Sequence, residues 1–285
     1  MQEFEEFRPQ LRDIAYRMLG STTEADDAVQ ESWVRLHRSD SERVENLRGW
    51  LTIVVGRVCL DMLRARHRRR EEYVGTWLPE PVVVEDDARD PEQEAVVADS
   101  IGLALLAVLE KLSPAERIAF VLHDMFAVPF DDIAEILGRE PAAARQLASR
   151  ARRRLRGQAP IPSSDIGSQR KVVDAFLSAT RSGDFEALVE ILDPDVVFSI
   201  DVGLIAPAAR PPIAGSKAVI DEVRARGPQF AHLARPAIVN GAAGLVIGTE
   251  RRIMGVVAFS ITNGRIARID IVADPEKLRS VRPRS

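Results

Sequence analysis

The sequence contains a single cysteine, Cys59, so the chain has no internal disulfide framework. Sparing use of cysteine is typical of proteins that work in a reducing cytosol. No apolar run approaches the ~20 residues of a membrane-spanning helix, and the first ten residues, MQEFEEFRPQ, carry acids where a signal peptide carries basic residues. We therefore expect a soluble, cytoplasmic protein without a membrane partner.

Motifs of cofactor and nucleophile chemistry are missing as well. The sequence has no G-x-G-x-x-G, no cysteine pair of metal-ligand spacing and no G-x-S-x-G. We expect no cofactor, no metal site and no catalytic residue. What the chain does have is length: 285 residues that are 46% hydrophobic are enough for the cores of two or three domains.

The net charge of −4 conceals a segregation of charge along the chain. Ten arginines and four acids lie between Arg35 and Arg70. Residues 145–156 carry six arginines and no acid, whereas residues 80–99 carry eight acids and one arginine. Two basic patches separated by an acidic spacer indicate contact with a polyanion at two points. A solvated face would explain the run from Arg64 to Arg70, taken alone, equally well.

Helical periodicity runs from residue 4 to about residue 72. It predicts a helix closed by Gly20, a second helix capped by Thr22 or Thr23, and a third helix from Leu47. Opposite its apolar face the second helix presents Asp27, Gln30 and Glu31. The outer face of the third helix carries Arg57, Asp61, Arg64 and His67.

A helix-turn-helix is predicted within residues 101–157. Ser113 and Glu116 form a capping-box pattern, Asp131 or Asp132 begins the next helix, and Gly138 ends it. A basic helix follows from residue 141, in the position of a recognition element. Its outer face carries Arg145, Gln146, Ser149, Arg150 and Arg153.

Beyond the linker GQAPIPSSDIGS the pattern changes to two helices followed by strands. Asn240-Gly241 and Asn263-Gly264 lie between alternating apolar runs, a strong hairpin signal. These features predict an α+β domain with a curved, antiparallel sheet.

Three segments, in this order, resemble extracytoplasmic-function (ECF) sigma factors of bacterial RNA polymerase over roughly residues 4–157. TEADDAVQESWVRLHR is similar to the polymerase-binding region, LRGWLTIVVGRVCLDMLR to the −10 helix, and the segment from LSPAER to RRRLR to the −35 region. WLPEP at residues 77–81 and ADPEKL at residues 273–278 resemble motifs of the SigJ-like group, which adds a SnoaL-like domain. The stretch DVGLIAPAARPPIAG departs from the glycine-rich loop often found in that group.

The resemblance implies a multidomain chain: two all-α sigma domains, the second a helix-turn-helix, and an α+β SnoaL-like cone. The implied boundaries are sigma region 2 at 1–72, a WLPEP linker at 73–100, sigma region 4 at 101–157, a linker at 158–168, the SnoaL-like regulatory domain at 169–278 and a tail at 279–285.

The resemblance also implies partners, core RNA polymerase and promoter DNA, and assigns residues to them. It assigns polymerase binding to Asp27, Gln30 and Glu31. It assigns recognition of the −10 element to Trp50, Arg57, Asp61 and Arg64. The polar loop 40–46 would receive a base that is extruded from the duplex. Trp50 could instead be buried in the core. The −35 element falls to Arg145, Gln146, Ser149, Arg150 and Arg153.

The prolines of VGTWLPEPV forbid a helix, yet this linker segment carries a tryptophan and a leucine. We expect it to pack against the chain's end and fix the domain arrangement. The interdomain residues are then Trp77, Leu78, Pro79, Pro81, Asp274, Pro275, Lys277 and Leu278. The acidic run 85–94 either mimics nucleic acid or is a solvated spacer.

Two other functions stay open on the sequence alone. One is a freestanding helix-turn-helix regulator that binds duplex DNA without polymerase. The other is a cone-fold cyclase or isomerase fused to DNA-binding helices, for which the candidate acid–base residues are Asp201, His232, Glu250 and Asp270. A small-molecule ligand in the C-terminal domain is compatible with either a regulatory or an enzymatic cone.

Overall fold

The structure is a computed structural model that describes residues 2–38, 46–69, 76–85, 102–156, 165–203, 211–249 and 251–281. Residues 40–45 of the polar loop, residues 86–94 of the acidic run and Glu250 lie outside the described residues. Among the described helices, none is long and apolar enough to cross a bilayer.

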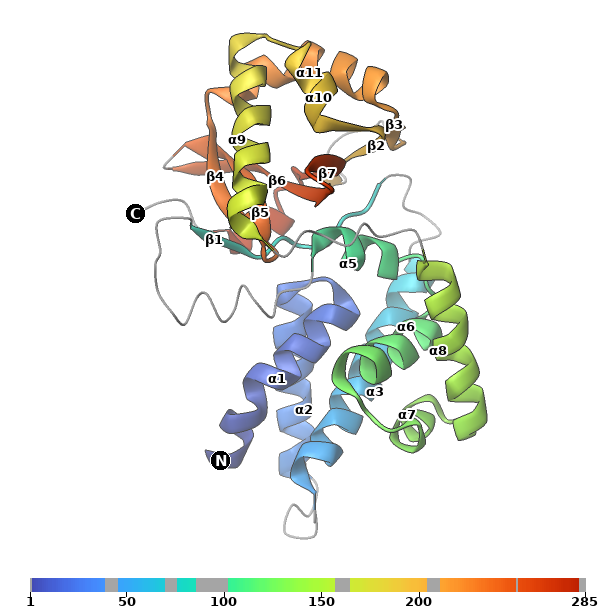
Figure 1. Ribbon diagram of the computed structural model, residues 1–285. Coiled ribbons are helices and arrows are strands. Elements are labelled where there is room, and N and C mark those ends of the chain that lie inside the picture. Colours follow the sequence, from blue (N-terminus) through green and yellow to red (C-terminus); the bar gives the residue numbers. More distant parts are fainter. Residues whose placement is uncertain are drawn as a thin grey trace. The chain divides into compact units, whose positions relative to one another are not determined.

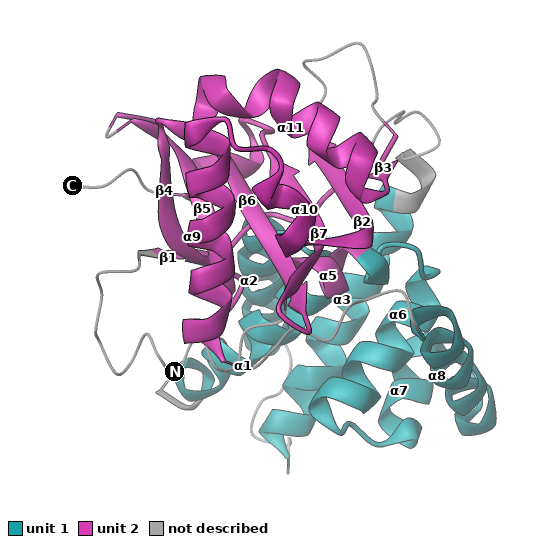
Figure 2. Cartoon of the chain, turned by 45° about the horizontal axis from the view of Figure 1, so that its top comes forward, with its two compact units in different colours: residues 1–73, 108–158 teal, residues 74–107, 159–285 magenta. Residues whose placement is uncertain are grey.

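The chain forms two compact units, shown in different colours in Figure 2. Unit 1 comprises residues 1–73 and 108–158, and unit 2 comprises residues 74–107 and 159–285. The segment that contains WLPEP therefore belongs to unit 2. So do residues 102–107, because Leu103 is buried in the same apolar cluster as Leu78 and Val272.

Unit 1 is helical, in the order the periodicity predicts. Its helices are α1 (Gln2–Leu19), α2 (Thr22–Arg38), α3 (Leu47–Arg69), the end of α5 (Leu103–Leu109), α6 (Pro114–Phe120), a π-helical turn η3 (Val121–Met125), α7 (Phe130–Leu137) and α8 (Pro141–Leu155). Helices α1, α2 and α3 pack on one another, and α6, α7 and α8 form the helix-turn-helix region.

Helix boundaries in unit 1 agree with the predictions except at the starts of α2 and α7. The Ser113–Glu116 capping box is present, and Gly138 ends α7 in the left-handed conformation at φ 62°. The predicted cap of α2 is wrong, since the Ser21 hydroxyl accepts the Glu24 amide at 3.1 Å. The predicted start of α7 at Asp131 or Asp132 is also wrong, because the helix begins at Phe130 after Pro129 and has no side-chain cap.

Cys59 lies fully buried in α3, and burial raises the pKa of its thiol to about 12, partly opposed by the charge of Arg117. Because the thiolate is the reactive form, the native protein at pH 8 holds only about one part in 10⁴ as thiolate. We expect no labelling by iodoacetamide in native buffer and full labelling in denaturant, measured by intact mass. Labelling at equal rates in both conditions would contradict the burial.

Unit 2 is a seven-stranded sheet with helices on one face (Figure 1). Its strand order is β1-β4-β5-β6-β7-β2-β3. The strands are β1 (Val83–Glu85), β2 (Leu192–Asp201), β3 (Ile213–Ala214), β4 (Ala234–Val239), β5 (Ala242–Thr249), β6 (Arg252–Thr262) and β7 (Arg265–Val272). Only the β2–β7 pairing is parallel within this sheet. The helices are α9 (Ile166–Ser182), α10 (Ala187–Ile191) and α11 (Ser216–Ala231), and a short 3₁₀ turn, η5 (Lys277–Ser280), follows the last strand.

Both predicted hairpins are confirmed. Asn240 and Gly241 have φ values of 49° and 75°, and Asn263 and Gly264 have 53° and 74°. Positive φ at both central residues is the type I′ geometry that matches the twist of the flanking strands. These turns fix the register of β4 with β5 and of β6 with β7.

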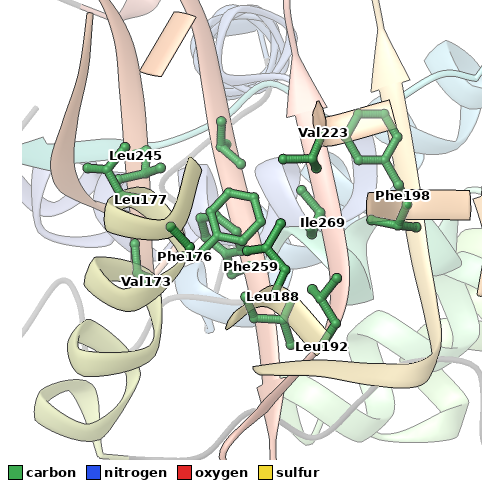
Figure 3. Packing of buried hydrophobic residues seen from close by; sticks show 14 of the residues in the cluster. Val173, Phe176, Leu177, Leu188, Leu192, Phe198, Val223, Leu245, Phe259 and Ile269 are labelled. Atoms are coloured by element: carbon green, nitrogen blue, oxygen red, sulfur yellow. The ribbon is translucent and has the colours of Figure 1, made fainter. Parts of the chain in front are cut away.

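The two faces of the sheet bury different partners. Figure 3 shows the helix-covered face, where Phe176 of α9, Phe198 of β2 and Ile269 of β7 belong to one core. Since side chains alternate along a strand, residues 199, 201, 270 and 272 point to the other face. That face is covered by Leu78 of the linker segment, by Leu103 at the start of α5, and by Leu278 and Val281 from the chain's end.

Candidate nucleic-acid interface and linker anchor

Helix α8 presents a basic outer face. Ala144, Leu147, Ala148 and Ala151 are buried on its inner side, where α8 packs on α6 and α7. All five side chains assigned to the −35 element, Arg145, Gln146, Ser149, Arg150 and Arg153, are exposed. Arginine and glutamine are the donors best matched to guanine and adenine edges in a major groove.

Acidic residues of the neighbouring helices hold several of the α8 arginines. Arg154 and Arg150 approach the two carboxylate oxygens of Glu116 at 2.7 and 3.5 Å, and Arg152 pairs with Asp124 at 2.6 Å. Arg153 has no ion pair among the described residues. The exposed face therefore contains arginines that are oriented by carboxylates and at least one that is not.

The outer face of α3 contacts the helix-turn-helix inside unit 1. Arg57 is exposed, yet its guanidinium donates to the Glu135 carboxylate at 2.9 Å and to the Glu135 carbonyl at 3.3 Å. One residue earlier, a Cβ on Gly56 would lie 2.8 Å from Ile136 Cδ1, so α7 packs directly on the α3 backbone. This contact between distant residues could not be predicted from helical periodicity.

The other −10 candidates are spread along α3. Asp61 and Arg64 are exposed and lie 3.8 Å apart as a loose ion pair. Trp50 is half-buried, which leaves both base stacking and packing open to it. The structure thus places Asp61 and Arg64 together and ties Arg57 to α7.

Not all the arginines of the first basic patch face solvent. Arg66 pairs with Glu24, donates to the Leu19 carbonyl at 2.7 Å and lies 3.7 Å from Glu110. Glu110 also pairs with Arg117, which is 2% exposed. This cluster ties α2 and α3 to α6, because a buried charge needs a partner of opposite sign. Sequence reasoning missed this cluster, because its members are far apart along the chain.

Helix α2 carries the face predicted to bind polymerase. Asp27, Gln30 and Glu31 are exposed, and Glu31 forms a surface pair with Arg35 at 2.9 Å. Next to them a groove of about 510 Å³ separates the outer sides of α1 and α2, with Phe4, Val29, Gln30 and Trp33 in its lining. Glu5, Arg8 and Asp26 also line the groove, and its mainly anionic rim is suited to a basic protein surface.

Trp77, Leu78, Asp201 and Lys277 form a linker anchor within unit 2. The Asp201 carboxylate, which is fully buried, accepts the Leu78 amide at 2.7 Å and the Lys277 ammonium at 2.6 Å. Lys277 also donates to the Leu78 carbonyl at 2.6 Å and lies 4.1 Å from the centre of the Trp77 ring. One cation and one anion thus fix both polar groups of Leu78 and the adjacent indole.

The remaining linker residues extend this anchor. Pro79 and Pro81 are buried. The Asn240 amide donates to the Val82 carbonyl at 2.8 Å, and the Val82 amide donates to the Asn240 side-chain oxygen at 3.1 Å. Directly after Val82, strand β1 pairs with β4. Asp274 accepts the Glu276 amide at 3.0 Å and begins the turn that carries Lys277 and Leu278, whereas Pro275 is exposed. Sequence reasoning missed Asp201 and Asn240 in this role.

The three candidate acid–base residues that the structure describes, Asp201, His232 and Asp270, do not meet in the cone. Asp201 and Asp270 point away from the helix-covered face, and His232 is exposed. Burial raises the pKa of Asp270, although Arg268 donates to its carboxylate at 2.6 Å and opposes the shift. Asp201 and Asp270 therefore lie on the face of the sheet that the linker segment and the chain's end cover.

The helix-turn-helix, the two arginine-bearing helices and the anionic helix define the class of a helical, DNA-binding transcription factor. Residues 4–69 match the family model Sigma-70 region 2, and residues 102–155 match Sigma-70, region 4.

The full-length relatives agree. The ECF RNA polymerase sigma factor SigJ of Mycobacterium tuberculosis is 41% identical, over 96% of this chain and 92% of its own. Probable ECF RNA polymerase sigma factor SigI of the same species is 35% identical over 96% of this chain and 93% of its own. The crystal structure of M. tuberculosis SigJ covers 97% of each chain with a TM-score of 0.78 at 39% identity. The chain belongs to the ECF family of RNA polymerase sigma factors, and the predicted fold class is confirmed.

Proposed function

We propose that this chain is an alternative sigma factor that binds core RNA polymerase through α2 and directs it to promoters through α3 and α8. The observation that carries the proposal is the outer face of α8, where five polar or basic side chains are exposed over a buried, small-residue face. The exposed acids of α2 support a protein partner there, because like charge excludes the DNA backbone. Its place of action is the cytoplasm, with polymerase and promoter DNA as partners.

Reconstituted initiation tests this function. Purified chain and core RNA polymerase are mixed with fragmented genomic DNA, and transcript 5′ ends are mapped by sequencing. We expect a defined promoter set that core polymerase alone does not use. Binding of the pure chain to duplex DNA without any specific initiation would instead support a freestanding regulator.

The triple variant Asp27→Ala, Gln30→Ala, Glu31→Ala tests the polymerase face. We expect its affinity for core polymerase to fall at least tenfold, since charge pairs at an interface couple by about 1.5 kcal/mol or more. Asp221→Ala, Glu190→Ala, Glu276→Ala is the matched control, because these side chains are exposed in unit 2. Equal affinities of the two triple variants in fluorescence anisotropy would contradict the assignment.

Unit 2 acts, in this proposal, by holding the segment between the two DNA-binding regions. Its support is the linker anchor, which fixes the backbone of Leu78 to strand β2 and to the turn η5. A chain cut near residue 158 would expose Leu78 and Pro79, so point variants of the anchor are the cleaner test of modulation.

The contact of Arg57 with α7 gives a further prediction. Glu135→Gln removes the charge that holds the guanidinium, so Arg57 becomes more available to single-stranded DNA. Because the pair is exposed, it contributes at most about 1 kcal/mol, and we expect binding of a −10 oligonucleotide to improve up to about fivefold. Fluorescence anisotropy measures it, with Glu140→Gln as the exposed control. Weaker binding by Glu135→Gln would refute this role for Arg57.

A further inference from the structure

The helix-covered side of the unit 2 sheet encloses an apolar cavity of about 320 Å³. Phe176 of α9, Phe198 of β2 and Ile269 of β7, all labelled in Figure 3, line it together with Leu245 and Val257. Its volume lies at the small end of the range of ligand sites, about 300–1,000 Å³. A well-packed core holds few voids larger than a water molecule, so a space of this size is a built feature of the domain.

The chemistry of the lining selects against charged occupants. Among the described lining residues only Glu222 and Arg226 are ionisable, and they neutralise each other at 2.8 Å along α11. The Thr180 hydroxyl donates to the Phe176 carbonyl at 2.8 Å, so its proton is already used. A charged group inside would remain unpaired, which is costly in an apolar site.

The mouth of the cavity exposes apolar surface. Phe230 of α11 is 37% exposed and Met254 of β6 is 40% exposed, and both line the cavity. Large apolar side chains in contact with water beside an apolar cavity are typical of an entry to a binding site. Methionine in particular adapts its shape to different occupants.

We propose that this cavity binds an uncharged, mainly hydrocarbon small molecule. Asp201 and Asp270 point to the opposite face of the sheet, so neither carboxylate contacts the occupant. The proposed ligand site does not depend on the proposed promoter recognition. A negative result for ligand binding would leave promoter recognition standing, and a negative result for promoter recognition would leave the ligand site standing.

Binding of 1-aminoanthracene, which is uncharged at neutral pH, tests the cavity on the full-length protein by its fluorescence. Decanol, decanoate and decylamine then compete for the probe, with one chain length and three head groups. We expect saturable binding and displacement by decanol at concentrations at least tenfold lower than by either charged compound. Absence of saturable binding, or displacement by decanoate or decylamine as good as by decanol, would overturn the proposal.

Two variants locate the site. Ile271→Trp fills the cavity from β7 and should abolish probe binding, whereas Val189→Trp, at an exposed position outside the cavity, should leave it unchanged. Circular dichroism establishes folding of each. If Ile271→Trp does not fold, Met254→Lys at the mouth is the test and should weaken binding at least tenfold. Wild-type affinity in the folded cavity variant would place the probe elsewhere and refute the site.

Discussion

Asp201→Ala is expected to lower the free energy of unfolding of unit 2 by about 3–5 kcal/mol. The substitution removes the acceptor of the Leu78 amide and leaves the Lys277 ammonium, whose side chain is 11% exposed, without its carboxylate. It also removes the acceptor of the Gly203 amide at 3.0 Å. Urea unfolding followed by tryptophan fluorescence measures the loss, and limited proteolysis reports release of the linker near Trp77.

The matched control is Asp221→Ala. Asp221 pairs with Arg224 at 3.5 Å with both side chains more than half exposed, so its loss should cost less than about 1 kcal/mol. Trp77→Ala separates the polar anchor from its aromatic contact, because it keeps the Asp201–Lys277 pair. If Asp201→Ala were as stable as Asp221→Ala and equally resistant to protease, the anchor would not hold the linker.

Arg153→Ala is expected to weaken binding of −35 promoter duplex by about 1–3 kcal/mol, or roughly 5- to 150-fold. Arg153 lies on the outer face of α8 and has no ion pair among the described residues, so its guanidinium is available for a base edge or a phosphate. If the contact is to phosphate, the loss will be similar for all sequences and the log–log salt slope will fall by about one. A loss confined to one sequence would indicate base reading.

Arg152→Ala is the control on the same helix. Arg152 pairs with Asp124 at 2.6 Å, so most of its effect should fall on stability instead of DNA affinity. Anisotropy with labelled duplex at two salt concentrations measures both variants. Equal affinities of Arg153→Ala and the wild type for the duplex, at both salt concentrations, would contradict the assignment of α8 as the recognition helix.

Local chemistry made much of the fold predictable. The Ser113 capping box and the left-handed Gly138 depend on residues three or four positions apart, and the two Asn-Gly turns need only their own backbone preferences. The exposed faces of α2 and α8 follow from helical periodicity, and all eight residues assigned to them are exposed. In these places each residue's neighbours along the chain decide its conformation.

Most contacts between residues far apart in the chain could not be predicted from the sequence. Strand β1 forms only because β4 offers it an edge, and two nearby prolines argued against regular structure there. Arg66 looks like its solvent-facing neighbours, yet it contacts Glu24 and Glu110 from other helices. Asp201 was a candidate catalyst because it is a carboxylate on a predicted strand of the cone. The face of the sheet to which it points depends on the pairing register with β7, which the sequence does not show.

The anchor also orders events during synthesis of the protein. Lys277 follows Leu78 by 199 residues, and β4 follows β1 by well over a hundred. At a translation rate of roughly 5–20 residues per second, about 10–40 s pass between the synthesis of Leu78 and that of Lys277. Both DNA-binding regions are therefore translated, and free to begin folding, before the segment joining them can be fastened. A nascent chain released early would keep its helices but not the tether between them.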